Sequence, residues 1–188
     1  ALTAPGQSVY VDAVNLTADT QMPAAVSPQT WQSQDIGNAG NAGSVATNGS
    51  TFTVSGSGLD IWNQGDAFRF LYQTRTGDGT LTARVTGLTP TDPWAKVGVM
   101  IRESLDSGSR NAFMLLSAVN GVSFQQRATT LGLTTSTTVG PSVTPPYWVR
   151  LVRSGNTLTG SVSSSGTSWT QIGTATLSGF NRTALWVL

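Results

Sequence analysis

The fold is decided by the stretch Lys96-Val97-Gly98-Val99-Met100-Ile101-Arg102-Glu103. Successive side chains of a β-strand point to opposite faces of its sheet. Val97, Val99 and Ile101 therefore share one face, and the other face carries Lys96, Gly98, Met100 and Arg102. This period of two predicts a strand with its β-branched face on a core and its other face in solvent.

Runs of the same kind recur on both sides of this stretch, separated by Gly, Asn, Asp, Ser or Pro. They predict strands over residues 8–16, 50–55, 68–74, 79–86, 96–103, 112–118, 121–127, 147–153, 157–163, 169–177 and 183–188. Asn120-Gly121 favours a tight type I′ hairpin turn, and Ser154-Gly155-Asn156 favours a turn between the next pair. No segment has the pattern of a helix. Short strands at regular spacing predict an all-β fold, an antiparallel two-sheet jelly-roll sandwich.

Two segments interrupt this pattern. Residues 17–30 contain two prolines and no clear period, so we expect a linker arm between an N-terminal strand (residues 1–16) and the sandwich body (residues 31–188). Residues 134–146 are rich in Thr and end in Pro145-Pro146, which favours a long surface loop.

The composition argues against catalysis. The chain has no His and no Cys, one Glu (Glu103) and one Lys (Lys96). It therefore lacks the usual proton shuttle, the thiol nucleophile and most ways of pairing carboxylates. Glu103 lies near Asp106, but the residues between them lead into a turn, so we expect a solvated acid at the rim. We expect the protein not to be an enzyme.

The charge and hydropathy of the chain argue against nucleic acid and the membrane interior as partners. Charged residues make up 10% of the chain, against about 25% in an average soluble domain. The ten basic residues are scattered and give a net charge of +1, so the basic footprint that nucleic acid requires is missing. No apolar stretch is long enough to insert into a membrane. A neutral surface rich in hydroxyl groups is typical of secreted or cell-surface proteins.

Several motifs carry a resemblance to a known group. They are Trp31–Gly37, Phe52–Trp62, Asp66–Gln73, Gly77–Gly79, Trp94–Glu103, Pro146–Leu151 and Ser163–Trp169. Over residues 31–180 the chain resembles the concanavalin/laminin-G-like modules of secreted bacterial carbohydrate-active enzymes, a group also described as regulation of enolase protein 1. The resemblance implies a jelly roll with an accessory, glycan-binding role. Glycosidases of similar fold carry Glu-x-Asp-x-Glu on one strand, and this chain has no such motif.

The two ends of the chain depart from that group. The modules it resembles continue through further strands after the segment equivalent to residues 173–177, whereas here the apolar run 184–188 is the last. Residues 9–16 resemble the missing closing strand. Folded back in cis they give a monomer; donated in trans, with residues 17–30 as the arm, they link subunits into a head-to-tail fibre. The strand-donation interface is expected at Val9, Tyr10, Val11, Val14, Leu16, Leu185, Trp186 and Leu188.

A polar sheet face is the candidate ligand site. If the strands are neighbours, alternation places on it Arg69, Gln73, Lys96, Arg102, Gln125 and Arg127. Such a face suits an acidic or hydroxyl-rich saccharide, although an antiparallel sheet ordinarily keeps one face solvated. Trp62 and Trp94 lie beside turns and can offer rings for stacking. The remaining tryptophans are assigned to packing: Trp31, Trp148, Trp169 and Trp186.

Calcium is the one candidate cofactor. Asp60, Asn63, Asp66 and Asp78 offer the oxygen ligands that this ion prefers. The alternative is that these side chains cap their own turns. The sequence therefore predicts a secreted, non-catalytic glycan-binding module, and the rival prediction is a structural or adhesive filament subunit linked through its N-terminal strand.

Overall fold

The computed structural model describes residues 7–18, 30–139 and 143–187. The described part of the chain is built from strands and has no helix that could span a membrane. The strands are β1 (Gln7–Ala18), β2 (Gln32–Ile36), β3 (Ser44–Asn48), β4 (Thr51–Gly56), β5 (Ile61–Trp62), β6 (Gly65–Asp66), β7 (Phe68–Thr76), β8 (Gly79–Leu88), β9 (Lys96–Arg102), β10 (Asn111–Ser117), β11 (Val122–Arg127), β12 (Thr135–Val139), β13 (Tyr147–Ser154), β14 (Thr157–Ser163), β15 (Thr170–Thr176) and β16 (Thr183–Val187).

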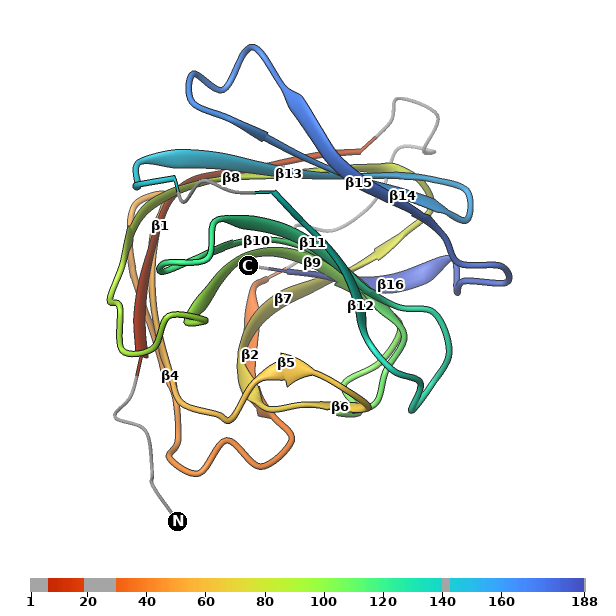
Figure 1. Ribbon diagram of the computed structural model, residues 1–188, viewed down its shortest axis with the longest axis horizontal. Coiled ribbons are helices and arrows are strands. Elements are labelled where there is room, and N and C mark those ends of the chain that lie inside the picture. Colours follow the sequence, from red (N-terminus) through yellow and green to blue (C-terminus); the bar gives the residue numbers. More distant parts are fainter. Residues whose placement is uncertain (1–6, 19–29, 140–142, 188) are drawn as a thin grey trace.

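Two seven-stranded antiparallel sheets form the sandwich. Sheet A has the order β15-β14-β13-β8-β1-β4-β3, and sheet B has the order β12-β11-β10-β9-β16-β7-β2. Figure 1 shows β8 and β13 of sheet A above the strands of sheet B, with the small β5–β6 hairpin below them. The predicted all-β, antiparallel two-sheet fold is confirmed.

The main core lies between the two sheets. It is formed by the side chains that point inward from both sheets. Among them are Leu81 of β8, Val99 of β9, Met114 of β10 and Leu151 of β13, which are all fully buried. Gly160 and Gly173, which pair across β14 and β15, make room for the ring of Phe124. A Cβ atom on either glycine would lie 2.5 or 2.6 Å from that ring, so the core requires glycine at both positions.

A second apolar cluster covers the opposite face of sheet B. Phe70, Tyr72, Met100 and Phe113 pack there against Ile61 of the β5–β6 hairpin. As a result β10 is buried along its whole length, and β9 is buried everywhere except at Lys96. The prediction that one face of residues 96–102 is solvated is therefore wrong, because segments distant in sequence fold over that face.

All eleven predicted strands are present, with ends that differ by one or two residues. The short strands β2, β3, β5, β6 and β12 were not predicted, and β12 lies inside the segment 134–146 that was assigned to a loop.

Gly155 and Asn156 form the two-residue turn expected between β13 and β14, since Ser154 pairs with Thr157. The type I′ turn at Asn120-Gly121 is wrong: φ is positive at Gly121 but not at Asn120, and the Ser117 N–H donates to the Gly121 carbonyl across a longer loop.

The first and the last strand of the chain, β1 and β16, each lie between two other strands, in different sheets. β1 lies between β8 and β4 of sheet A in the same chain, so it completes that sheet in cis. β16 lies between β9 and β7 of sheet B. The residues expected at a strand-donation interface therefore lie in two different sheets: Val9, Tyr10, Val11, Val14 and Leu16 on β1 of sheet A, and Leu185 and Trp186 on β16 of sheet B. Leu188 lies outside the described residues. Thr17 and Ala18, assigned to the linker arm, belong to β1, and residues 19–29 of that arm are outside the described part.

Candidate functional site

The six residues predicted to form one polar face are divided between the two faces of sheet B. Gln73 pairs with Trp186, and Trp186 pairs with Ile101, so Gln73 is on the side that faces sheet A. Arg69 is on the same side, where its guanidinium lies 3.2 Å from the carboxylate of Asp35. The opposite side carries Lys96, Arg102, Gln125 and Arg127. The prediction that these six side chains share one face is therefore wrong. Alternation shows which residues of one strand share a face, but the register between β7 and β9 is set by β16, which lies between them.

Arg127 is buried in an ion pair. Its two terminal nitrogens lie 2.6 and 2.8 Å from the two carboxylate oxygens of Asp66. The side chains of Arg127 and Asp66 are both 0% exposed. The guanidinium also donates to the backbone carbonyls of Trp62, Asn63, Ser107, Ser109 and Gly132, and to the hydroxyl of Thr134.

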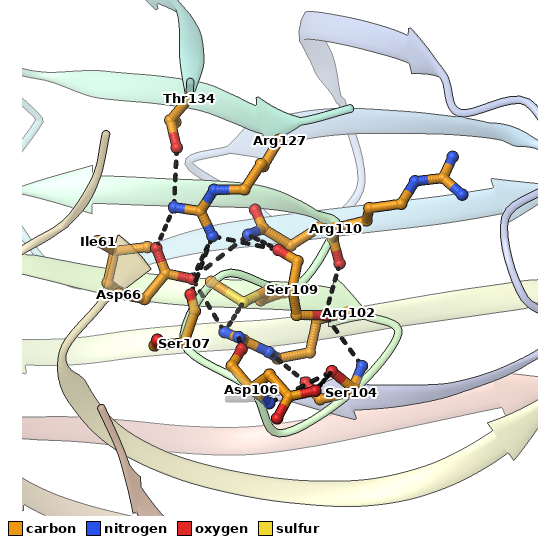
Figure 2. A network of polar contacts seen from close by, with 12 residues as sticks. Ile61, Asp66, Arg102, Ser104, Asp106, Ser107, Ser109, Arg110, Arg127 and Thr134 are labelled. Carbon is orange, nitrogen blue, oxygen red and sulfur yellow. Dashed lines mark hydrogen bonds and ion pairs between the residues drawn. The ribbon is translucent and has the colours of Figure 1, made fainter. Parts of the chain in front are cut away.

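Arg102 is the second buried cation on the same carboxylate. Its Nη1 lies 3.1 Å from Asp66 Oδ2, and its other nitrogens donate to the carbonyls of Ser104 and Asp106. The guanidinium also lies over the rings of Phe68 and Phe70. Burial lowers the pKa of Arg102 to about 10, although the Asp66 carboxylate acts in the opposite direction, so the group stays charged at neutral pH. Figure 2 shows both guanidinium groups converging on Asp66.

This buried network holds three loops on the outer face of sheet B. The β5–β6 turn contributes the carbonyls of Trp62 and Asn63, and the β11–β12 loop that of Gly132. The β9–β10 loop contributes the carbonyls of Ser104, Asp106, Ser107 and Ser109. Arg102 and Arg127 are therefore structural anchors without access to a ligand. Gln125 is also buried, and its Oε1 has no hydrogen-bond partner among the described residues. The prediction that these three side chains form an exposed binding face is wrong.

Lys96 belongs to a different, partly exposed cluster. Its Nζ lies 5.8 Å from the ring centroid of Trp62 and 5.8 Å from that of Trp94, and it pairs with the carboxylate of Asp60. The Trp94 side of the cluster is open, since this residue is 42% exposed. The Trp94 N–H donates to Asp92 Oδ1 at 2.7 Å, which holds the turn that presents the ring. We call Asp60, Trp62, Trp94 and Lys96 the tryptophan corner.

Exposed apolar side chains flank the tryptophan corner. Leu59, which is 91% exposed, precedes Asp60, and the N–H of exposed Val119 donates to the carbonyl of Pro93, next to Trp94. Exposed Leu133 precedes Thr134, whose N–H donates to the Asn63 carbonyl beside Trp62. The sequence reasoning missed Leu59, Val119 and Leu133. A large apolar residue among Gly, Asp and Asn in a turn was the available signal.

Comparison with protein-family models, with curated proteins and with solved structures finds no match. The resemblance to concanavalin/laminin-G-like modules therefore stays a prediction. The function of the tryptophan corner is argued below from its geometry and chemistry alone.

The four calcium candidates do not form one site. Asp66 is bound by two guanidinium groups, and Asp60 is bound by the Lys96 ammonium and the Ile61 N–H. Asp78 lies in the β7–β8 turn, where its carboxylate accepts the Gly155 N–H at 2.7 Å. The Asn63 carbonyl accepts hydrogen bonds from Arg127 and Thr134. Within the described ranges no group of three or more His, Cys, Asp or Glu side chains could hold a metal ion. The carboxylates of Asp60, Asp66 and Asp78 are instead bound by cationic groups or backbone N–H groups.

Glu103 has a structural role similar to that of Asp78. Its carboxylate lies 3.3 Å from Arg110 and accepts the Asn181 N–H at 2.7 Å. Asp106 instead accepts a hydrogen bond from the Ser104 hydroxyl. Glu103 and Asp106 thus make separate contacts, and both lie in the loop between β9 and β10.

Proposed function

We propose that the protein is an extracellular, non-catalytic module that binds a saccharide at the tryptophan corner. The observation that supports this most directly is the pair of indole rings on one ammonium group, with one of the two residues, Trp94, 42% exposed. Flat aromatic rings stack on the C–H faces of sugars, and such contacts need a ring that is held in place. The Asp92 hydrogen bond to the Trp94 backbone supplies that rigidity.

Polar groups beside the rings suit a hydroxyl-rich ligand. The side chain of Asp60 is 43% exposed while it pairs with Lys96, so its carboxylate can still accept hydrogen bonds from sugar hydroxyls. The ammonium and the carboxylate compensate each other's charge. The corner therefore favours a neutral, hydroxyl-rich sugar, which is one of the two ligand classes predicted for the sheet face.

The first test is a pull-down of the protein against insoluble neutral polysaccharides such as cellulose, chitin and xylan. Trp94→Ala removes the exposed ring, and we expect binding to fall about tenfold, the equivalent of about 1.4 kcal/mol. Trp62→Ala is expected to act in the same direction. Trp31→Ala is the matched control, since that ring packs against Phe52 in a separate apolar cluster, and it should leave this binding unchanged. Equal binding by the wild type and both corner variants would refute the proposal.

A second candidate function, self-assembly by strand exchange, is favoured by one observation. β1 pairs with β8 on one side and with β4 on the other, so its removal leaves a gap one strand wide in sheet A. Residues 7–18 of a second copy could fill the same gap by β-strand addition. The truncation experiment in the Discussion separates this function from the saccharide-binding proposal.

A further inference from the structure

Arg150 is a cation on the outer face of sheet A, far in the fold from the tryptophan corner. On β13 the neighbouring residues Val149 and Leu151 enter the core, so Arg150 points to the other face. Its guanidinium carbon lies 4.1 Å from the ring centroid of Trp169, which precedes β15. Trp169, assigned to packing from the sequence, is half-buried and supports the guanidinium from one side.

Among the described residues, no carboxylate forms an ion pair with Arg150. Arg69, Arg102, Arg110 and Arg127 each pair with a carboxylate. Arg150 has neither an ion pair nor a hydrogen bond among the described residues, and its buried Nε has no partner. Burial lowers the pKa of this guanidinium, as expected for a cation without a counter-charge. Nε is the only nitrogen of this side chain that is fully buried without a partner, so the terminal nitrogens of the half-buried guanidinium are open to an anion from outside the described residues.

The surroundings suit an anion. In the sheet register Arg150 lies beside Thr82 of β8 and Ser161 of β14, and their side chains share its face. Ser161 is only 4% exposed, so Thr82, which is half-buried, is the hydroxyl that a ligand can reach. Arg84 lies on the same face between Trp148 and Asp12 in the register, and it already has an interaction of its own. A guanidinium stacked on a ring keeps its edge free, and that edge matches the two oxygens of a carboxylate or sulfate group.

We propose that Arg150, stacked on Trp169 and beside Thr82, binds a carboxylate or sulfate group of an acidic polysaccharide. The terminal nitrogens of the guanidinium bind two oxygens of the group, the Thr82 hydroxyl donates to it, and Trp169 stacks beside the sugar or fixes the guanidinium plane. This site is independent of the saccharide-binding proposal, since it lies on the other sheet and requires an anionic ligand.

The probes are soluble polygalacturonate for carboxylates, dextran sulfate for sulfate esters, and uncharged dextran as the reference polymer. Arg150→Met keeps much of the stem and removes the charge, and we expect affinity for at least one acidic polymer to fall tenfold or more. Arg150→Lys is expected to recover only part of it, because an ammonium cannot bind two oxygens in one plane. Trp169→Leu should weaken the same binding.

Arg182→Met is the control that loses the same charge, since this arginine is exposed on the loop before β16. An equal loss in Arg150→Met and Arg182→Met would overturn the proposal, because only net charge would then matter. Failure of the wild type to bind either acidic polymer, or binding of free sulfate alone, would also overturn it. Trp94→Ala should leave acidic-polymer binding unchanged, which separates this site from the tryptophan corner.

A thermal melt of each variant checks that it folds. If Arg150→Met does not fold, titration of the wild type supplies the test. The NMR signal of the Arg150 Nε–Hε group should shift with the acidic polymer and not with dextran, and an unmoved signal at saturation would contradict the assignment.

Discussion

At the scale of single residues, Asp66 is the acid on which the outer face of sheet B depends. Two fully buried guanidinium groups share its carboxylate, and the carbonyls of three loops satisfy their remaining N–H groups. A buried charge is tolerated when it is paired and hydrogen-bonded, and it becomes costly when its partner is removed. The arginines predicted to contact ligand are thus held by the protein itself.

Asp66→Asn should destabilise the protein strongly, because two buried cations lose their counter-charge. We expect the free energy of unfolding to fall by about 3 to 5 kcal/mol, measured by urea denaturation. Asp78→Asn is the control: this exposed acid accepts one backbone N–H, and the cost should be about 1 kcal/mol or less. Similar losses in both variants would show that the ion pairs with Arg102 and Arg127 contribute little.

At the scale of strands, the small residues of β14 and β15 are as decisive as the large ones. Gly160 and Gly173 lie opposite each other and accept the ring of Phe124 from sheet B. Closely packed interiors resist even one additional methyl group. This contact determines how near the β14–β15 hairpin can approach sheet B.

Gly173→Ala should cost about 1 to 3 kcal/mol of stability, because its Cβ would lie 2.6 Å from the Phe124 ring. Combining it with Phe124→Leu tests the cause. The double variant should lose less stability than the two single variants added together, since the smaller side chain relieves the clash. Strict additivity in the double-mutant cycle would argue against the proposed contact.

The sequence predicts the long strands well because each has an alternating run of several apolar residues. β2 and β3 escape prediction because Gln32–Ile36 and Ser44–Asn48 contain mostly polar residues. The candidate face failed for another reason: burial of Arg102 and Arg127 depends on loops that lie near β9 and β11 only after folding. Arginine is ordinarily exposed, so alternation alone places these residues in solvent. Trp62, Trp94 and Lys96 were named individually, but their contact with one another depends on tertiary structure.

At the scale of the whole molecule, β1 joins two parts of sheet A that otherwise do not touch in the sheet. Without it, β15-β14-β13-β8 and β4-β3 are separate sets of strands with open edges. Exposed strand edges promote association. The N-terminal strand is therefore part of the fold and not an appendage.

A variant that lacks residues 1–18 should lose stability and aggregate. A synthetic peptide of residues 7–18 should restore the folded state in trans, whereas a scrambled peptide should not, as measured by circular dichroism and light scattering. Unchanged stability of the truncated chain would contradict the central place of β1. In the full chain, a mass that stays monomeric at all concentrations would reject strand exchange between copies and leave saccharide binding untouched.

The position of β16 has a consequence for biosynthesis. Residues 183–187 leave the ribosome after every other described residue, yet they fill the middle of sheet B between β9 and β7. The strands on either side of this position, β9 and β7, are therefore synthesised before the strand that joins them. Closure of sheet B is expected to be slow, because the pairing of β16 with β7 joins residues about a hundred positions apart. A nascent chain stalled before residue 183 should therefore remain accessible to chaperones.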